Sequence, residues 1–480
     1  MKFLVIGGID LSQNKETEIQ LQYIEKCKEL LAKSSTKRPT FHIQNEGCQM
    51  NSIQTESIAA IMEKMGYEMV DTEDADAVVF NTCTVRENAN QKIYGHLGHL
   101  KSIKRNHPDM KIVLFGCMMQ EHHVVEKIRK DYKYVNLVFG THNIHKFPEL
   151  FYRALQTDDQ IIDIWKESDE IVEGMPTSRK YSFKTGVSVM FGCNNFCSYC
   201  IVPYVRGRER SRKPEEIIKE IKRLVADGVV EVMLLGQNVN SYGKNLETPM
   251  TFAELLREIE KIPGLERIRF MTSHPKDLSD ELIQVMAESQ KICRHLHLPL
   301  QSGSSRILKE MNRRYTKEQF LALAEKIKAA VPGISLTTDI IVGFPGETEE
   351  DFEETLDVVR NVRFDSAFTF IYSKRTGTPA AAMENQVPED VVKERFDRLL
   401  KEVQDISAEV CGRDVHTVQQ VLVEEVNDHS PELMTGRMSN NTVVHFPGDA
   451  SMIGSLVDVY LEESRGFYYM GRIHEDSGEA

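Results

Sequence analysis

Three cysteines lie close together in the segment FGCNNFCSYC, at positions 193, 197 and 200. Thiolates are common ligands of zinc and of iron–sulfur clusters, and a closed site takes four of them. After Cys200, no cysteine or histidine follows before His274. Zinc would need a fourth ligand at short spacing, so C-x3-C-x2-C favours an iron–sulfur cluster with one open iron. A zinc knuckle and plain core cysteines are the alternatives.

Three further cysteines are far apart in the chain but follow predicted strands in the same way. Cys48, Cys83 and Cys117 are separated by 35 and 34 residues, about one βαβ unit each. Each comes just after a strand-like run, in FHIQNEGC, VVFNTC and VLFGC. The carboxyl ends of parallel strands share one edge of a sheet, so we expect the three thiols to converge there. The alternative is three buried cysteines at strand ends, since cysteine is often buried. Cys27, Cys293 and Cys411 lack this phase, and we expect them to be structural.

The elements that must position the second set alternate regularly. Strands are predicted at 41–44, 75–85, 111–117 and 135–140, and helices at 52–66, 86–104, 121–132 and 146–155. Strands that alternate with helices predict right-handed βαβ units and a parallel sheet. An amphipathic helical stretch at 16–33 precedes them.

A polar stretch at 165–180 is a predicted linker, and strands again alternate with helices after it. Six strands are predicted, at 186–190, 231–236, 267–272, 295–300, 334–344 and 367–372. Six βα units are fewer than the eight of a closed barrel, so we expect an open, partial (β/α)6 barrel with a closing helix at 388–410. Cys193, Cys197 and Cys200 then follow the first strand, at the mouth where barrel enzymes keep their chemistry.

The last ~65 residues consist of short β-like runs, which predict a small β-barrel of the oligonucleotide-binding sort. The fold class is therefore α/β, with a parallel sheet domain, a partial barrel and a small all-β barrel. The predicted bounds are 1–37 for an N-terminal extension, 38–153 for the domain with the distant cysteines, 178–410 for the barrel and 412–476 for the terminal module.

The composition is that of an ordinary globular protein, with 41% hydrophobic and 28% charged residues. No apolar run reaches the ~18 residues that a membrane helix needs. The segment MKFLVIGGID is shorter than the core of a signal peptide, so we expect a cytoplasmic protein without membrane contact. The net charge of −14 argues against bulk binding of nucleic acid, so any contact with RNA must use local basic patches.

Several basic residues could form such patches. They are Arg206, Arg208, Arg210, Arg212 and Lys213 in one run, with Arg313, Arg314, Lys374 and Arg375 near the same predicted barrel. Contact with phosphate is one role for such a run and a solvated surface is the other. The terminal module has only four basic against 12 acidic residues from Arg413 to Ala480, a charge of −8. There, Phe467, Tyr468 and Tyr469 could contact RNA or pack in the core.

The C-x3-C-x2-C spacing with Tyr199 before the last cysteine resembles the signature of the radical S-adenosylmethionine (radical SAM) superfamily. The resemblance implies that three cysteines hold a [4Fe–4S] cluster whose fourth iron binds the amine and carboxylate of S-adenosylmethionine. Electron transfer from the cluster would then split the sulfonium and give a 5′-deoxyadenosyl radical.

Two open clusters and a terminal β-module resemble one family over nearly the whole chain, the radical SAM methylthiotransferases, whose terminal module is a TRAM domain. Five motifs are similar to the members that make 2-methylthio-N6-dimethylallyladenosine in tRNA. They are GCQMN, NTCTVRENANQKIYGHLG, VPYVRGRERSR, HLPLQSGS and IVGFPGETEEDF. Phe191 and Thr376 depart from the family, which usually has an acidic residue and a proline at these places.

The resemblance implies methylthiolation at C2 of N6-dimethylallyladenosine beside the tRNA anticodon, with C–H becoming C–SCH3. That hydrogen is neither acidic nor hydridic, which explains the need for a radical. The implied cofactors are two [4Fe–4S] clusters and S-adenosylmethionine, as methyl donor and radical source. The implied partners are the anticodon stem-loop, an electron donor such as flavodoxin or ferredoxin, and a source of sulfur. The alternative substrates are a different modified adenosine and a ribosomal-protein aspartate. The alternative from another class is a non-catalytic iron–sulfur carrier or RNA-binding protein.

Other positions give weaker signals for binding of cofactor or base. Gln237, Asn238 and Asn240 follow the second barrel strand, where turn chemistry is the alternative. His295 and His297 share one face of the fourth strand, which should be the polar lumen. Asp339 and Gly343 lie near the end of the fifth strand, where the superfamily often contacts adenosine and where barrel packing is the alternative. The predicted cofactor contacts are Tyr199, Gln237, Asn238, Asn240, His297, Asp339 and Gly343.

Overall fold

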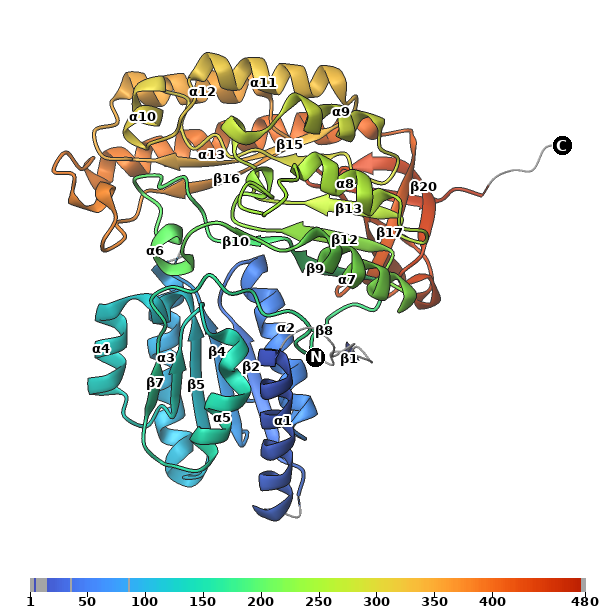
Figure 1. Cartoon of the computed structure of the whole chain (residues 1–480). Helices are drawn as coiled ribbons and strands as arrows, with labels where there is room; N and C mark the ends of the chain where they lie inside the picture. Colours follow the sequence, from blue (N-terminus) through green and yellow to red (C-terminus); the bar gives the residue numbers. More distant parts are fainter. Residues whose placement is uncertain (1–3, 6–14, 35–36, 85–86, 476–480) are drawn as a thin grey trace. The chain divides into compact units, whose positions relative to one another are not determined.

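The computed structural model of the chain describes residues 4–5, 15–34, 37–84 and 87–475 (Figure 1). The chain forms two compact units. The first consists of Met1–Asn194, Cys200–Glu220 and Leu235–Gln237, and the second of Asn195–Tyr199, Ile221–Leu234 and Asn238–Ala480.

The first unit contains a six-stranded sheet in the order β3-β2-β4-β5-β6-β7, and every neighbouring pair is parallel. The strands are β2 (Thr40–Asn45), β3 (Glu68–Met69), β4 (Ala77–Thr82), β5 (Lys111–Gly116), β6 (Leu137–Phe139) and β7 (Ile161–Asp163). The connecting helices are α2 (Gln49–Lys64), α3 (Glu87–Asn106), α4 (His122–Asp131) and α5 (Phe147–Leu155). The predicted parallel α/β sheet is thus confirmed.

Helices cover both faces of this sheet (Figure 1). Alternate side chains point to opposite faces of a strand, so Val79 and Phe115 pack with α2 and α5, whereas Phe80 and Leu114 pack with α3 and α4. Because both faces are buried, β4 and β5 are buried along their whole length. This explains why they read in the sequence as continuous hydrophobic runs rather than as alternating ones.

The amphipathic stretch near the N-terminus is helix α1 (Lys15–Ser34), and it belongs to the core of the first unit. Its Cys27 is fully buried, and the thiol faces the Pro148 carbonyl of α5 at 3.8 Å. Strand β1 (Leu4–Val5) pairs with β8 (Ser178–Arg179). The polar stretch after β7 is held in place, since Glu173 accepts hydrogen bonds from Arg212 at 2.6 and 2.8 Å.

The six predicted barrel strands all form. They are β9 (Lys184–Ser188), β12 (Glu231–Leu235), β13 (Arg267–Phe270), β14 (His295–His297), β15 (Ser335–Val342) and β16 (Ser366–Ile371). In the second unit, β12 pairs in parallel with β13, and β14, β15 and β16 form a parallel sheet. In the first unit, the Val189 N–H just after β9 donates to the carbonyl of Leu235 at 2.8 Å.

The short pairs and helices around these strands complete the barrel region. They are β10 (Met190–Phe191) with β11 (Arg210–Ser211), α6 (Val202–Arg206), α7 (Pro214–Ala226), α8 (Phe252–Glu260), α9 (Asp280–Glu288), α10 (Ser305–Glu310), α11 (Lys317–Ala330), α12 (Glu349–Val362) and α13 (Glu389–Cys411). Helices α8, α11 and α12 each begin with a capping box, in which a threonine and the residue three places later satisfy backbone amides.

The C-terminal segment is a closed five-stranded barrel in the order β17-β18-β19-β21-β20. The strands are β17 (Val418–Val426), β18 (Leu433–Met438), β19 (Val443–Pro447), β20 (Leu456–Ser464) and β21 (Tyr468–Ile473). The predicted small β-barrel is therefore confirmed. Tyr469 lies in its core, Tyr468 is half-buried, and Phe467 is 63% exposed.

Two buried arginines of β13 connect the C-terminal barrel to the second unit's parallel strands. Arg267 donates to the carbonyls of Gln420 and Arg437, both at 2.8 Å. Arg269 donates to the carbonyls of Met438 and Ser439 at 2.8 and 3.0 Å. Its Nε also donates to Glu231 at 2.9 Å, which compensates the buried charge.

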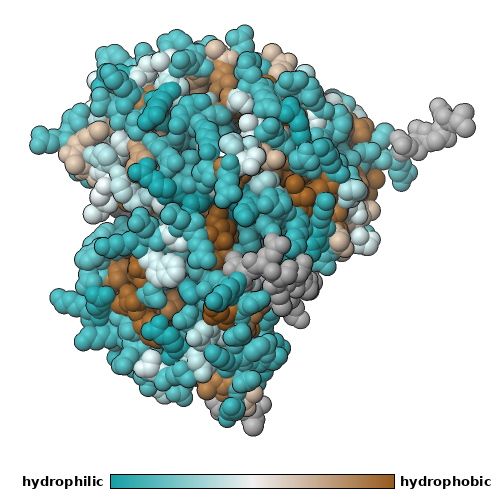
Figure 2. Space-filling view, viewed as in Figure 1, coloured by the Kyte–Doolittle hydropathy of each residue, from teal (hydrophilic) through white to brown (hydrophobic). Residues whose placement is uncertain are grey.

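Among the described residues, no helix is both long and apolar enough to span a membrane. The face drawn in Figure 2 is mainly hydrophilic, and its hydrophobic side chains lie in separate small groups.

Candidate functional site

The three distant cysteines follow three adjacent strands of the first unit's sheet. Cys48 lies three residues after β2 and directly precedes α2, Cys83 follows β4, and Cys117 follows β5. The strands β2, β4 and β5 are neighbours and parallel, so all three cysteines lie at the carboxyl edge. Cys83 and Cys117 are buried, and Cys48 is exposed.

A pair of buried asparagines lies beneath these cysteines. Asn51 Nδ2 donates to Asn81 Oδ1 at 2.7 Å, and Asn81 Nδ2 donates to the carbonyl of Asn51 at 2.8 Å. The thiol of Cys48 donates to Asn51 Oδ1 at 3.2 Å. The pair ties the first turn of α2, directly after Cys48, to the end of β4, directly before Cys83.

The glycines before Cys48 and Cys117 leave room for this pair. A Cβ at Gly47 would lie 2.4 Å from the Asn51 side chain, and one at Gly116 would lie 2.6 Å from Asn81 Oδ1. Gly116 also has φ +107°, a conformation that favours glycine. Both glycines therefore allow close approach of the backbone at the cysteines.

Burial and nearby groups set the pKa of the Cys117 thiol. Burial raises the pKa of Cys117 to about 11; the Arg206 guanidinium opposes this, and the thiols of Cys83 and Cys48 reinforce it. A thiol that is protonated in the absence of metal must release its proton when it binds iron, because only the thiolate is a metal ligand.

No three His, Cys, Asp or Glu side chains within the described ranges are grouped tightly enough to bind one metal ion. A cubane iron–sulfur cluster makes a different demand, because each cysteine binds a different iron atom. Three thiols at the carboxyl ends of adjacent parallel strands suit a cluster of several iron atoms, because they need not meet at one ion.

The segment with the three close cysteines is divided between the units. Cys193 and Cys200 belong to the first unit and Cys197 to the second. The Cys193 N–H donates to the carbonyl of Gly207 at 3.1 Å. The preceding Gly192 has φ +75°, and a Cβ there would lie 2.0 Å from the carbonyl oxygen of Arg208. A glycine thus precedes a cysteine at three of the six predicted ligand positions, Cys48, Cys117 and Cys193.

In the second unit, the backbone around Cys197 is held by the end of α10 and the residues after it. Asn312 Nδ2 donates to the carbonyls of Asn195 and Phe196 at 3.1 and 2.9 Å. The hydroxyl of Ser198 donates to the carbonyl of Glu310 at 2.7 Å. The positive φ of Phe196, 49°, turns the chain sharply before the cysteine.

A buried arginine accompanies Cys197. Arg313 Nη1 lies 3.8 Å from Cys197 Sγ, and its Nη2 donates to the carbonyl of Pro299 at 2.7 Å. Burial lowers the pKa of Arg313, but the hydroxyls of Tyr315 and Tyr199 and the Cys197 thiol raise it well above its ordinary value. The guanidinium therefore stays charged beside the cysteine.

Buried polar atoms without a hydrogen-bond partner among the described residues mark the carboxyl ends of the second unit's strands. They are Asn238 Oδ1 and Asn240 Oδ1 after β12, Ser273 Oγ after β13, and Gln301 Oε1 after β14. Such atoms are costly unless a ligand completes them. Acceptor oxygens and a hydroxyl at this edge fit a polar cofactor such as S-adenosylmethionine.

The remaining predicted cofactor residues lie in varied surroundings. His297 Nδ1 is 3.0 Å from Thr337 Oγ1, and His297 Nε2 is 3.4 Å from Asp339 Oδ2. In the first unit, Gln237 Oε1 accepts a hydrogen bond from the Gly192 N–H. Tyr199 is half-buried against a cluster that includes Phe344. A Cβ at Gly343 would lie 2.5 Å from Val392 of α13, so this glycine serves packing of the closing helix.

The basic residues divide by burial. Arg206, Arg212 and Arg313 are at most 8% exposed and bind inside the protein, which does not fit the predicted contact with RNA phosphates. Arg210 is half-buried and donates to the carbonyl of Ser168. Arg208 and Arg314 are exposed.

Sequence reasoning missed several residues of these sites. They are Asn51 and Asn81 beneath the distant cysteines, and Ser273 and Gln301 at the ends of the barrel strands. Asn51 and Gln301 stand in the motifs GCQMN and HLPLQSGS, but only the fold shows what they contact.

Comparisons with known proteins agree with this architecture. Residues 187–359 match the radical SAM superfamily, 40–140 match the family described as "Uncharacterized protein family UPF0004", and 412–473 match the TRAM domain. The fold and the cysteine segment thus define a radical SAM protein with two additional domains.

The particular family follows from close relatives of nearly the same length. A protein of Lachnoclostridium phytofermentans is 62% identical over 91% of this chain and 96% of its own, and one of Clostridioides difficile is 51% identical over 96% and 97%. Both are named tRNA-2-methylthio-N(6)-dimethylallyladenosine synthase. The chain belongs to this family of methylthiotransferases.

Solved structures support the fold alone. A radical S-adenosylmethionine methyltransferase from Kitasatospora setae, with cobalamin and a [4Fe–4S] cluster bound, superposes with a TM-score of 0.52 at 15% identity. The match covers 72% of this chain and 77% of that one.

Proposed function

We propose that the protein replaces the C2 hydrogen of N6-dimethylallyladenosine in tRNA with a methylthio group. The observation that carries the proposal is the position of Cys48, Cys83 and Cys117 at one edge of a parallel sheet, in a chain that also has the C-x3-C-x2-C segment. Relatives of nearly equal length that are named for this product support the choice of substrate.

In this proposal, Cys193, Cys197 and Cys200 hold the radical SAM [4Fe–4S] cluster, and Cys48, Cys83 and Cys117 hold an auxiliary [4Fe–4S] cluster. When bound, the clusters and S-adenosylmethionine supply the hydrogen-abstracting radical, the methyl group and the sulfur. The cysteines bind as thiolates, and each set leaves one iron free for a ligand other than protein.

The second unit provides the groups that orient S-adenosylmethionine and the base. Asn238, Asn240, Ser273 and Gln301 offer their unsatisfied polar atoms to the cofactor. Their fixed positions at strand ends preorganise the site, so little entropy is lost when the cofactor binds. His297 and Asp339 form a polar pair on neighbouring strands that can accept hydrogen bonds from an adenine or a ribose.

Contact with tRNA is assigned to exposed groups. Arg208 and Arg314 can neutralise phosphates, and Phe467 of the C-terminal barrel can stack on a base. The proposal includes an electron donor such as flavodoxin or ferredoxin, a source of sulfur and a place in the cytoplasm. The proposed domain bounds remain 38–153, 178–410 and 412–476, after an extension at 1–37.

The test is anaerobic reconstitution with iron and sulfide, followed by incubation with S-adenosylmethionine, a reductant and tRNA that carries dimethylallyladenosine. Nucleoside mass analysis should detect 2-methylthio-N6-dimethylallyladenosine. Parallel reactions contain tRNA with a different modified adenosine, or ribosomal protein. Product in one of these and none with dimethylallyladenosine would overturn the substrate, and no cleavage of S-adenosylmethionine would overturn the enzyme.

A further inference from the structure

A five-residue helix of the first unit connects Cys200 to the distant cysteines. Helix α6 begins two residues after Cys200 and ends at Arg206. Ile201 and Val205 pack against Cys117 in one hydrophobic cluster. The Thr141 hydroxyl donates to the carbonyl of Val205 and fixes the end of the helix against the loop after β6. The segment after the radical SAM cysteines is therefore anchored at the distant ones.

Arg206 extends from the end of this helix to the distant cysteines. Its side chain is buried, with 5% of the residue exposed. Nη2 donates to Asn51 Oδ1 at 2.9 Å and lies 3.4 Å from Gln54 Oε1. Asn51 Oδ1 is the same oxygen that accepts from the Cys48 thiol at 3.2 Å. A single amide oxygen thus links the guanidinium to a predicted cluster ligand.

The partners of Arg206 are unusual for a buried cation. Among the described residues, Arg206 donates hydrogen bonds to amide oxygens and lies near the thiols of Cys48, Cys83 and Cys117, and it forms no ion pair with a carboxylate. Arg212, six residues later and equally buried, has the carboxylates of Glu173 and Glu220 at 2.6 and 2.7 Å. A buried charge without a counter-ion costs several kcal/mol. An anion held by the three thiols would supply the missing counter-charge.

We propose that Arg206 is the counter-cation and positioning residue of the auxiliary [4Fe–4S] cluster, and that it raises the reduction potential of that cluster. The inference rests on the proposed function, because it assumes that Cys48, Cys83 and Cys117 bind this cluster. A cluster held by three thiolates is negatively charged, and an added electron increases that charge. A cation fixed beside it stabilises the reduced state, since net charge and hydrogen bonds set cluster potentials.

The burial of Arg206 favours a role beside the auxiliary cluster over the contact with RNA phosphate that the basic run predicted. A guanidinium that is enclosed by Asn51, Gln54 and three thiols cannot reach an RNA backbone unless the site opens. Arg208, two residues later, is exposed and is the arginine of this pair that solvent reaches. The two arginines of the RGR sequence then have different functions.

The test compares Arg206→Lys, Arg206→Gln and Arg208→Gln in chains whose Cys193, Cys197 and Cys200 are alanine, so that only the auxiliary cluster contributes. Iron per chain is counted, and the midpoint potential is measured by redox titration with EPR detection. Arg206→Gln should make reduction at least tenfold less favourable, a midpoint about 59 mV lower. Arg206→Lys keeps the charge and should recover more than half of this shift, whereas Arg208→Gln should leave the potential unchanged.

An unchanged potential in Arg206→Gln, or an equal decrease in Arg208→Gln, would overturn the inference. If Arg206→Gln does not retain iron, Arg206→Lys decides. A cluster retained in Arg206→Lys near the wild-type potential supports the role, whereas loss of iron from both variants, with a wild-type circular dichroism spectrum, would contradict a role carried by charge. An Arg206→Lys potential as low as that of an Arg206→Gln cluster would contradict the role of charge. Failure of the proposed function would give a different result: the chain with Cys193, Cys197 and Cys200 replaced by alanine, but with Arg206 intact, would bind no iron.

Discussion

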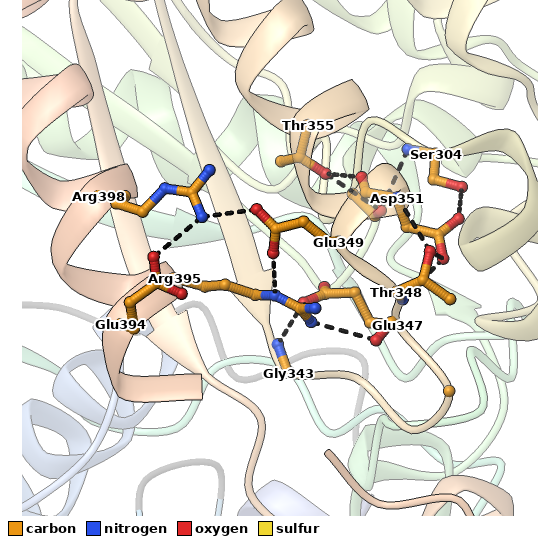
Figure 3. A network of polar contacts seen from close by, with 12 residues as sticks. Ser304, Gly343, Glu347, Thr348, Glu349, Asp351, Thr355, Glu394, Arg395 and Arg398 are labelled. Carbon is orange, nitrogen blue, oxygen red and sulfur yellow. Dashed lines mark hydrogen bonds and ion pairs between the residues drawn. The ribbon is translucent and has the colours of Figure 1, made fainter. Parts of the chain in front are cut away.

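Arg395 Nη1 lies 3.1 Å from Glu347 Oε1, and both side chains are almost fully buried (Figure 3). Arg395 belongs to the closing helix α13, and Glu347 to the turn after β15. Glu347 Oε1 also accepts a hydrogen bond from the Gly343 N–H at 3.1 Å. The pair therefore fixes the closing helix to the end of the fifth barrel strand, at a glycine predicted to lie near the cofactor.

Loss of one partner should destabilise this fold strongly. Arg395→Met leaves Glu347 buried and without its cation, which costs about 3–5 kcal/mol in the free energy of unfolding. Arg398→Met is the matched control, because its pairs with Glu349 and Glu353 are half-exposed and contribute about 1 kcal/mol or less. Urea unfolding measures both. Equal losses in the two variants would show that the buried pair has no special role.

The arginines of β13 give a prediction about the C-terminal barrel. Arg269→Met removes two hydrogen bonds to backbone carbonyls of the C-terminal barrel and leaves Glu231 without a cation. We expect faster proteolytic cleavage between α13 and β17 than in the wild type. Arg257→Met, at an exposed pair with Glu281, should not change the rate. Identical cleavage of all three proteins would refute the anchoring role.

Gly116 should be essential for iron binding at the distant cysteines. A Cβ there would lie 2.5 Å from the Thr82 carbonyl oxygen, at φ +107°. Gly116→Ala should therefore lower the iron content. Gly66→Ala is the control, since Gly66 has φ +105° but open space around it, so only backbone strain of about 1–2 kcal/mol is added. Full iron in Gly116→Ala would contradict this reading of the loop.

His295 should make the fold sensitive to mild acid. Burial, with Arg269 nearby, lowers the pKa of His295 to about 3, whereas an unfolded histidine titrates near ~6.5. Below pH ~6.5 the unfolded chain binds the extra proton, so stability should fall as pH drops, by up to about 1.4 kcal/mol per pH unit. His295→Gln should flatten this slope between pH 7.5 and 5.5, and exposed His429→Gln should not. Parallel slopes in the two variants would exclude His295 as the cause.

The order and type of the secondary-structure elements could be predicted from the sequence, because hydrophobic periodicity and turn residues determine each element locally. Strands that alternate with helices gave the parallel sheet, and the 35- and 34-residue intervals placed Cys48, Cys83 and Cys117 after adjacent strands. The short β runs after α13 likewise predicted the terminal barrel. In each case, neighbouring residues carry the signal.

Contacts between distant segments could not be read in the same way. Arg206 stands in a basic run, and such runs usually face solvent, yet its guanidinium is buried against Asn51. Asn51 and Asn81 are polar residues 30 positions apart, and only strand order brings them together. Gln301 is one of many glutamines until its oxygen is found buried without a partner among the described residues.

The central claim is that two separate sets of cysteines each hold a [4Fe–4S] cluster, and the most direct test is the iron content of matched variants reconstituted without oxygen. The wild type should bind about eight irons per chain. Cys83→Ala should bind about four and form no methylthiolated nucleoside, while Cys27→Ala, a buried cysteine of helix α1 in the same unit, should match the wild type. About four irons in the wild type, with no further loss in Cys83→Ala, would contradict the account.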